Sequence, residues 1–130
     1  MQSDNHKNLD TNKIKTKLRA NMDLNNKVAV VTGGASGLGK ATCIQLVQQN
    51  VKVAILDVNE DAALATINEL GKDNAVYVHV DVTDETSVEN AMSEVVSHYD
   101  HIDICVNCAG IAPAAKILDR ENNPMPLGKF

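Results

Sequence analysis

Residues 32–39 read Thr-Gly-Gly-Ala-Ser-Gly-Leu-Gly and directly follow the apolar run Val-Ala-Val-Val at 28–31. An apolar strand, spaced glycines and then a helical pattern are how a chain builds a site for dinucleotide phosphates. Gly33 allows a sharp turn off the strand, Gly37 allows close backbone approach to a pyrophosphate, and Gly39 allows the helix to pack against the strand. The N-terminus of the helix then presents free N–H groups and the positive end of its dipole to the phosphates.

An acidic residue completes this pattern at the end of the second apolar run. Residues 51–56 read Val-Lys-Val-Ala-Ile-Leu, and Asp57 follows them, 20 positions after Gly37. A carboxylate here accepts hydrogen bonds from ribose hydroxyl groups and repels a 2′-phosphate, and Val58 beside it supplies no compensating cation. We therefore expect NAD rather than NADP. The alternative interpretation of Asp57 is an acid that caps a helix or closes a turn.

The composition narrows the function classes. The chain has 130 residues, which suits one domain, and 44% of them are hydrophobic and 22% charged. Its net charge of −5 argues against nucleic-acid binding, which needs a basic surface. No run approaches the roughly 18 apolar residues of a membrane span, so we expect no membrane association. The few cysteines favour a reducing compartment, and we expect a cytoplasmic protein.

The chain divides into three segments. Residues 1–22 are polar and rich in Asn and Lys, and we interpret them as a disordered extension, with Met22 as an alternative start. Residues 23–111 carry the dinucleotide pattern and are predicted to form an NAD-binding half-domain. Residues 112–130 contain all three prolines and are predicted to form a loop or insertion.

Hydrophobic periodicity predicts alternating strands and helices in the middle segment. Strands are expected at 27–32, 51–56, 75–80 and 102–107, and helices at about 36–49, 60–70 and 84–99. Asn59 and Thr83 are expected to cap the second and third helices, and Gly71 to end the second. This alternation predicts an α/β fold, a Rossmann-type doubly wound parallel sheet with strand order 3-2-1-4. Asp81 and the Ala109-Gly110 turn would then share the cofactor edge.

Two other sets of residues are interpreted as having no catalytic or metal-binding role. Cys105 and Cys108 form a C-x-x-C spacing, but on a strand they point to opposite faces and away from any helix N-terminus, so we expect no redox pair. His79, His98 and His101 lack the spacing of metal ligands and are interpreted as solvated or strand-end residues. No metal site is expected.

Four motifs follow one another along the chain: the glycine segment at 32–39, Asp57, Asp81-Val82 and Val-Asn-Cys-Ala-Gly at 106–110. Their order and spacing carry a family resemblance. From about residue 24 to 111, the chain resembles the short-chain dehydrogenase/reductase family. The resemblance implies a cofactor site that consists of Gly33, Ser36, Gly37, Leu38, Gly39, Asp57, Val58, Asp81, Val82, Cys108, Ala109 and Gly110.

The resemblance also assigns roles within this site. Ser36 and Leu38 would lie along the pyrophosphate and the nicotinamide, Asp57 would bind the adenosine ribose, and Asp81 and Val82 would flank the adenine. Residues 108–110 would line the cofactor with backbone atoms.

One departure from the family pattern points to a subgroup. Most members have Asn-Asn-Ala-Gly where this chain has Asn-Cys-Ala-Gly at 107–110. The cysteine form, with an insertion at 116–130, resembles the type 2 3-hydroxyacyl-CoA dehydrogenases, also called 17β-hydroxysteroid dehydrogenases type 10. This resemblance implies NAD-dependent oxidation of a secondary alcohol, or reduction of a ketone, with 3-hydroxyacyl-CoA as one candidate substrate, by a homo-oligomeric full-length enzyme.

The family's acid–base catalyst is a Tyr-x-x-x-Lys pair with an upstream Ser. Tyr77 and Tyr99 are the two tyrosines of the chain, and each is followed four residues later by an aspartate. We therefore predict no catalytic residue here, and interpret the chain as an N-terminal cofactor-binding fragment with negligible turnover. Two alternatives stay open: a non-catalytic dinucleotide-binding module, and the inactive product of a broken gene.

Overall fold

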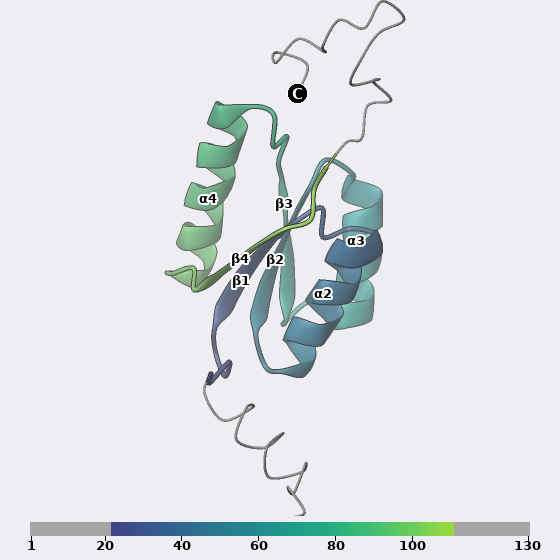
Figure 1. Ribbon diagram of the computed structural model, residues 1–130, viewed down its shortest axis with the longest axis vertical. Helices are drawn as coiled ribbons and strands as arrows, with labels where there is room; N and C mark the ends of the chain where they lie inside the picture. Colours follow the sequence, from purple (N-terminus) through teal and green to yellow (C-terminus); the bar gives the residue numbers. More distant parts are fainter. Residues whose placement is uncertain (1–21, 111–130) are drawn as a thin grey trace, which may run out of the picture.

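The computed structural model describes residues 22–110 (Figure 1). Strands and helices alternate along this part of the chain. Their order is β1 (Val28–Thr32), α2 (Gly37–Gln48), β2 (Lys52–Asp57), α3 (Glu60–Leu70), β3 (Ala75–His79), α4 (Glu85–Tyr99) and β4 (Ile104–Asn107). The predicted extension at 1–22, except for Met22, and the predicted loop at 112–130 lie outside the described residues.

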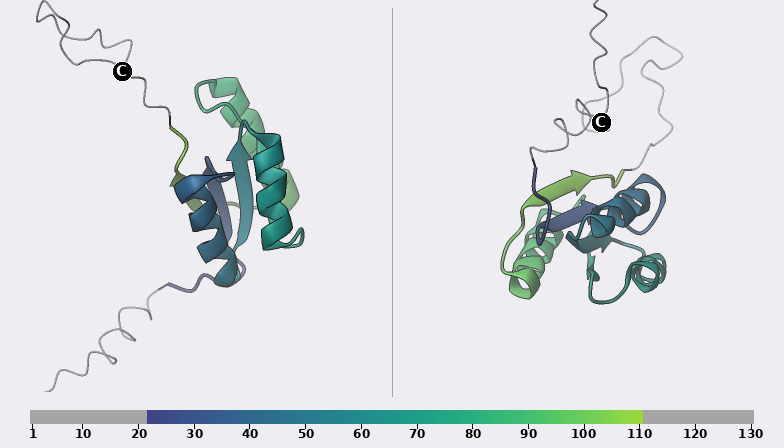
Figure 2. Two further views of the ribbon diagram at one scale, coloured as in Figure 1. Left: turned by 90° about the vertical axis from the view of Figure 1, so that its right-hand side faces the viewer. Right: turned by 90° about the horizontal axis from the view of Figure 1, so that it is seen from below.

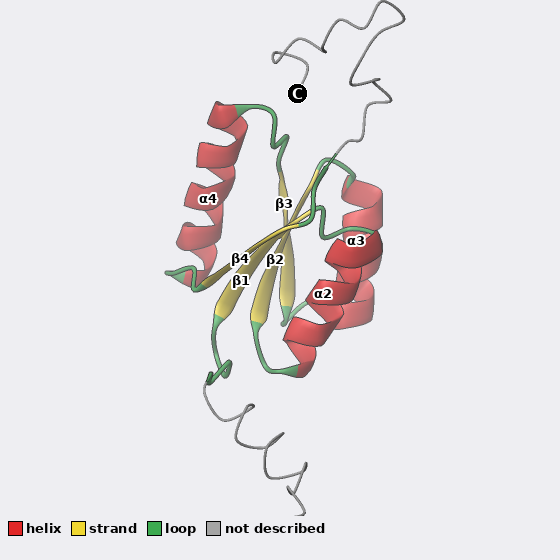
Figure 3. Ribbon diagram, viewed as in Figure 1, coloured by secondary structure: helices red, strands yellow, loops and turns green. Residues whose placement is uncertain are grey.

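The four strands form one parallel sheet in the order β3-β2-β1-β4, which confirms the predicted order 3-2-1-4. Helix α4 covers one face of the sheet, and α2 and α3 cover the other (Figure 3). All five residues of the central strand β1 are buried, as are four of the six in β2. Central strands of a parallel sheet are covered on both faces, and their continuous apolar runs follow from this burial.

The two faces of the sheet form two separate cores, because successive side chains of a strand point to opposite sides. The views in Figure 2 show the helices on either side of the sheet. The core under α2 and α3 includes Ala29, Val31, Val53, Ile55, Cys43 and Ile67. The core under α4 includes Val28, Val30, Ala54, Leu56, Ala91 and Val95.

Capping residues determine where helices α3 and α4 begin and where α3 ends. Helix α3 has its predicted bounds: the side chain of Asn59 accepts a hydrogen bond from the N–H of Ala62 at 3.0 Å, and Gly71 ends the helix with a φ of 90°. The predicted cap of α4 was wrong. Asp84, not Thr83, is the N-cap, because its carboxylate accepts bonds from the first turn, while Thr83 bonds to Asp81.

The strands differ from prediction by one or two residues at their ends. The largest difference is in β4, which begins at Ile104 rather than at residue 102. Ile102 lies before the strand and packs against the core under α4, whereas Ile104 and Val106 pack against the opposite core. Within the described residues, β4 pairs with β1 alone and forms one edge of the sheet.

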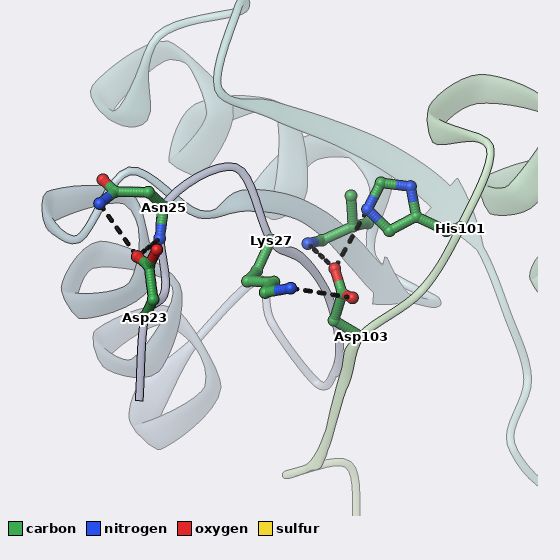
Figure 4. A network of polar contacts seen from close by, with 6 residues as sticks. Asp23, Asn25, Lys27, His101 and Asp103 are labelled. Atoms are coloured by element: carbon green, nitrogen blue, oxygen red, sulfur yellow. Dashed lines mark hydrogen bonds and ion pairs between the residues drawn. The ribbon is translucent and has the colours of Figure 1, made fainter. Parts of the chain in front are cut away.

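A carboxylate joins the beginnings of β1 and β4 at the amino-terminal edge of the sheet (Figure 4). The Oδ2 atom of Asp103 accepts a hydrogen bond from the N–H of Val28 at 2.8 Å. His101 Nε2 lies 3.1 Å from the same oxygen, and Lys27 Nζ lies 3.8 Å from Oδ1. The bond from Val28, together with the positive charge of Lys27 and the contact with His101, holds the pKa of Asp103 below its usual value.

We expect Asp103→Asn to lower the stability of the fold in a pH-dependent way. A depressed carboxylate pKa stabilises the folded state above the unfolded-state pKa of about 3.9, and this contribution is lost as the pH falls through the lower folded-state pKa. Denaturant unfolding should therefore separate the variant from wild type at about pH 7 and bring the two curves together towards about pH 3.

Asp23→Asn is the matched control, because among residues 22–110 the Asp23 carboxylate bonds to the nearby Asn25 alone. It should leave the unfolding midpoint nearly unchanged at either pH. An equal loss of stability for Asp103→Asn at both pH values would show that the charge of Asp103 is not the cause.

Candidate functional site

A cavity of about 460 Å³ opens at the carboxyl edge of the sheet, where the loops after all four strands meet. Parallel α/β sheets bind their ligands at this edge. The cavity brings together all twelve residues that the sequence pointed to: Gly33, Ser36, Gly37, Leu38, Gly39, Asp57, Val58, Asp81, Val82, Cys108, Ala109 and Gly110. Two further lining residues, Val80 and Thr83, were not predicted.

Three glycines shape the first wall of the cavity, each for a different reason. Gly33 has a φ of 67°, and a Cβ atom there would lie 2.7 Å from the backbone nitrogen of Ala109. A Cβ on Gly39 would overlap the carbonyl oxygen of Gly33. Gly37 has a φ of 55°, but a Cβ there would meet no atom within 4 Å. Gly33 and Gly39 therefore permit backbone packing, whereas Gly37 leaves cavity space open for a ligand.

Within residues 22–110, the N-terminus of α2 has no side-chain cap and can bind an anion. Ser36 is its N-cap residue, but the serine side chain makes no capping hydrogen bond, and the first turn contains no acidic residue. Unpaired N–H groups at a helix N-terminus, together with the helix dipole, favour a negatively charged ligand. Because Ser36 and residues 37–39 line the cavity, such a ligand would lie against them.

Asp57 ends β2 and lines the cavity next to Val58. Its Oδ2 atom accepts a hydrogen bond from the N–H of Ala35 at 3.1 Å, and its Oδ1 atom accepts one from the N–H of Asn59 at 3.0 Å. The carboxylate thus closes a local turn, as the alternative interpretation held, and also holds the glycine loop. Since each carboxylate oxygen accepts two hydrogen bonds, Asp57 keeps capacity for a ligand.

Asp81 follows β3 and forms a compact turn with Thr83. Its Oδ1 atom accepts hydrogen bonds from the N–H and the hydroxyl of Thr83, at 2.9 and 2.7 Å. These bonds hold the pKa of Asp81 below its usual value, and the nearby His79 adds to the effect. The N–H of Asp81 donates to the Ser87 hydroxyl at 3.0 Å, which ties the turn to α4.

Three large apolar side chains at the cavity are exposed to solvent: Leu38 at 82%, Val58 at 61% and Val82 at 45%. They come from three separate loops. Exposed apolar side chains that surround one cavity are typical of a binding site for a partly apolar ligand. The flat faces of a purine or a nicotinamide ring match this requirement.

The turn after β4 is fixed by Thr32, a residue of the glycine segment for which no role was predicted. The hydroxyl oxygen of Thr32 accepts hydrogen bonds from the N–H groups of Cys108 and Ala109, both at 3.2 Å.

The cysteines have different surroundings. Cys108 packs against the core under α2, whereas Cys105 is exposed. Burial raises the pKa of the Cys43 thiol in that core to about 12.

Thr66 was also missed. It is buried, and its hydroxyl donates to the carbonyl oxygen of Ala35 at 3.2 Å, so that α3 supports the glycine loop. A threonine inside an amphipathic helix carries no sequence signal that distinguishes this contact from ordinary packing.

Residues 22–110 contain neither a metal-binding cluster nor a membrane-spanning helix. No cluster of three or more His, Cys, Asp or Glu side chains there could hold a metal ion. No helix in that range has the length and apolarity to cross a membrane.

The known proteins similar to this chain include dehydrogenases and a reductase. The chain is 41% identical over 100 residues to secoisolariciresinol dehydrogenase of Forsythia intermedia, covering 75% of this chain and 36% of that protein. It is 44% identical over 89 residues to 3-hydroxyacyl-CoA dehydrogenase type-2 of Homo sapiens, covering 68% and 34%. It therefore spans little more than a third of the length of these relatives.

A solved structure shares the fold. The 3-ketoacyl-(acyl-carrier-protein) reductase from Brucella melitensis, complexed with NADH, superposes with a TM-score of 0.68 at 32% identity, covering 76% of this chain and 41% of that one. The family model described as short chain dehydrogenase matches residues 27–124. This match includes every strand and helix described above, and the chain belongs to the short-chain dehydrogenase family.

Proposed function

We propose that this chain binds a nicotinamide dinucleotide, with NAD preferred to NADP, and supplies the cofactor site of an oxidoreductase. The observation that carries the proposal is the cavity at the carboxyl edge, where a free helix N-terminus and the carboxylate of Asp57 line one space. Relatives named as dehydrogenases and a similar reductase complexed with NADH support it.

The residues of the cavity fit the parts of such a cofactor. The N–H groups near Gly37 would bind the pyrophosphate, because no Cβ blocks their approach. Asp57 would accept hydrogen bonds from the adenosine ribose, and Val58 and Val82 would contact the adenine. Leu38 and the backbone near Gly110 would contact the nicotinamide half. The cofactor supplies the hydride chemistry when bound, and these residues bind and orient it.

Calorimetric titration of the 130-residue chain with NAD and with NADP tests the proposal. Saturable binding of NAD, with weaker binding of NADP, is the expected result. A folded chain, checked by circular dichroism, that binds neither dinucleotide would overturn the proposal and favour the product of a broken gene.

Two glycine variants should separate binding from folding. Gly37→Ala should leave the fold intact at a cost of about 1–2 kcal/mol for the left-handed backbone, yet sharply weaken dinucleotide binding because its methyl group enters the ligand space. Gly39→Ala should disrupt the fold itself, since its methyl group overlaps the Gly33 carbonyl oxygen. Thermal unfolding and calorimetry on both variants measure the two effects. Unaltered NAD affinity in folded Gly37→Ala would argue against a pyrophosphate at this position.

Asp57→Asn should reduce the preference for NAD. Charge-assisted hydrogen bonds contribute about 1.5–3 kcal/mol, so NAD affinity should fall roughly tenfold or more, while NADP affinity holds or rises because a repelling charge is gone. Titrations with both cofactors measure the ratio. Since Asp57 also binds Ala35 and Asn59, the unfolding midpoint of the variant must be measured alongside. An unchanged ratio in a folded variant would contradict the role of Asp57.

The whole enzyme, on this proposal, interconverts a secondary alcohol and a ketone, with 3-hydroxyacyl-CoA as the candidate substrate class. The 44% identity to the human type-2 3-hydroxyacyl-CoA dehydrogenase supports this class. We further propose that the enzyme is a homo-oligomer and that it works in a reducing compartment such as the cytoplasm. The free cysteines of the described residues are compatible with that compartment.

The 130-residue chain should bind the cofactor without turning over substrate. Neither Tyr77 nor Tyr99 has a lysine four residues later, and loss of general acid–base catalysis alone lowers a rate by roughly 10²–10⁴. Absorbance of the reduced nicotinamide, with a 3-hydroxyacyl-CoA and NAD, measures turnover, and the full-length human relative is the positive control. Turnover above background would contradict this expectation. Binding without turnover is the result expected of a cofactor-binding fragment and equally of the second candidate, a non-catalytic dinucleotide-binding module.

A further inference from the structure

A second cavity lies at the amino-terminal edge of the sheet, opposite the edge that carries the proposed dinucleotide site. It has a volume of about 250 Å³ and is formed where the chain enters β1, β2 and β3. Its lining consists of Asn25, Asn26, Asn50, Val51, Lys52 and Asn74, with one cation and no carboxylate among them. This lining does not suit a mainly apolar ligand, because the amides would lose their hydrogen bonds to water.

Two asparagines with left-handed backbones fix the walls of this cavity. Asn26 has a φ of 56° and Asn50 a φ of 61°, and Asp100 is the other non-glycine residue of the described chain with a positive φ. The N–H of Asn26 donates to the carbonyl oxygen of Asn50 at 3.1 Å, and Nδ2 of Asn50 donates to Oδ1 of Asn25 at 3.2 Å. Residues held in this sparsely populated conformation cluster at ligand sites. The turns before β1 and β2 are thus held together in one arrangement.

Lys52 supplies the positive charge of the cavity. Its Nζ atom donates to the carbonyl oxygen of Asp73 at 2.6 Å and to Oδ1 of Asn74 at 3.4 Å. An ammonium group has three protons to donate, so one remains for a ligand. Both acceptors are neutral, and within residues 22–110 no carboxylate forms an ion pair with Lys52. The half-buried ammonium therefore has no anionic partner in the described part of the chain.

The amide side chains add neutral donors and acceptors. Asn25 and Asn74 each use both the nitrogen and the oxygen of the amide within the fold. Among residues 22–110, by contrast, the amide of Asn26 has no hydrogen-bond partner, and Asn50 keeps one amide proton and its side-chain oxygen. One charged donor beside neutral donors is the set that binds an oxyanion, and the amide oxygens can accept from hydroxyl groups next to it.

We propose that this cavity is a second ligand site, which binds a small oxyanion, a phosphate or a carboxylate, through the ammonium of Lys52 and the amides of Asn26 and Asn50. The two cavities share no lining residue, so the inference does not depend on the proposed dinucleotide site. A bound anion would join the turns before β1 and β2 and stabilise the folded chain by mass action.

NMR titrations of the 130-residue chain test this inference. Inorganic phosphate and acetate are added separately and compared with chloride at the same ionic strength, because salt alone screens an exposed charge. The side-chain amide signals of Asn26 and Asn50 should shift saturably with phosphate or acetate and not with chloride, and the tighter anion identifies the ligand class. Equal shifts with chloride, or no shifts, would overturn the inference. Oxyanion shifts confined to the first turn of α2 would also overturn it, and would support the dinucleotide site instead.

Two variants separate the contributions of charge and amide. Lys52→Met removes the charge, so the affinity for the anion should fall about threefold to tenfold, as expected of a partly exposed ionic contact. Lys72→Met is the matched control, because Lys72 is exposed and lies in the loop before β3 without lining the cavity.

Asn26→Gly removes an unpartnered amide, and glycine adopts the φ of 56° readily, so the fold should be kept. Its affinity for the anion should fall about twofold to tenfold, the effect of one neutral hydrogen bond. Wild-type affinity in folded Asn26→Gly and Lys52→Met, or an equal loss in Lys72→Met, would overturn the assignment of the anion to this cavity.

Discussion

The close approach of three backbone segments at Gly33 is the constraint on which the rest of the site depends. Gly39 brings the first turn of α2 against the carbonyl oxygen of Gly33, and Gly33 itself lies against the backbone of Ala109. The Thr32 hydroxyl fixes the same junction through the N–H groups of Cys108 and Ala109. Any side-chain atom at this junction would separate β1 from the turn after β4, and the cavity is the space that the junction leaves open.

Two carboxylates hold the sheet at its opposite edges by the same physical means. Asp103 accepts the N–H of Val28 at the amino-terminal edge, and Asp57 accepts the N–H of Ala35 at the carboxyl edge. Each joins backbone segments that are distant in the sequence. At Asp57 the bonds also orient the carboxylate towards the cavity before a ligand arrives. A pre-oriented acceptor loses less conformational entropy on binding, so its contribution to affinity is larger than that of a free side chain.

Elements with strong local signals were predicted well. The bounds of α3 followed from Asn59 and Gly71, and the strand order followed from right-handed crossovers between apolar runs. Because the carboxyl ends of parallel strands share one edge, residues from four loops could be assigned to one cavity. Contacts that depend on exact distances could not be predicted: Thr83 and Asp84 are both good caps, and the bond from Thr83 to Asp81 decides between them. The links from Tyr77 to His79 and from Thr66 to Ala35 depend equally on tertiary packing.

The position of β4 in the sheet bears on the order in which this domain assembles. β1 pairs with β2, and β2 with β3, so these three strands have partners that are close in the sequence. The pairing of β4 with β1 is long-range: Val28 bonds to Asp103 across 75 residues. Loop-closure entropy makes such long-range pairing the slower and later event in folding. During synthesis the first three strands emerge before β4, so a nascent sheet can form around β1 while the turn at Cys108 is still absent. The ligand cavity is therefore completed last, and a dinucleotide would select chains in which β4 has docked.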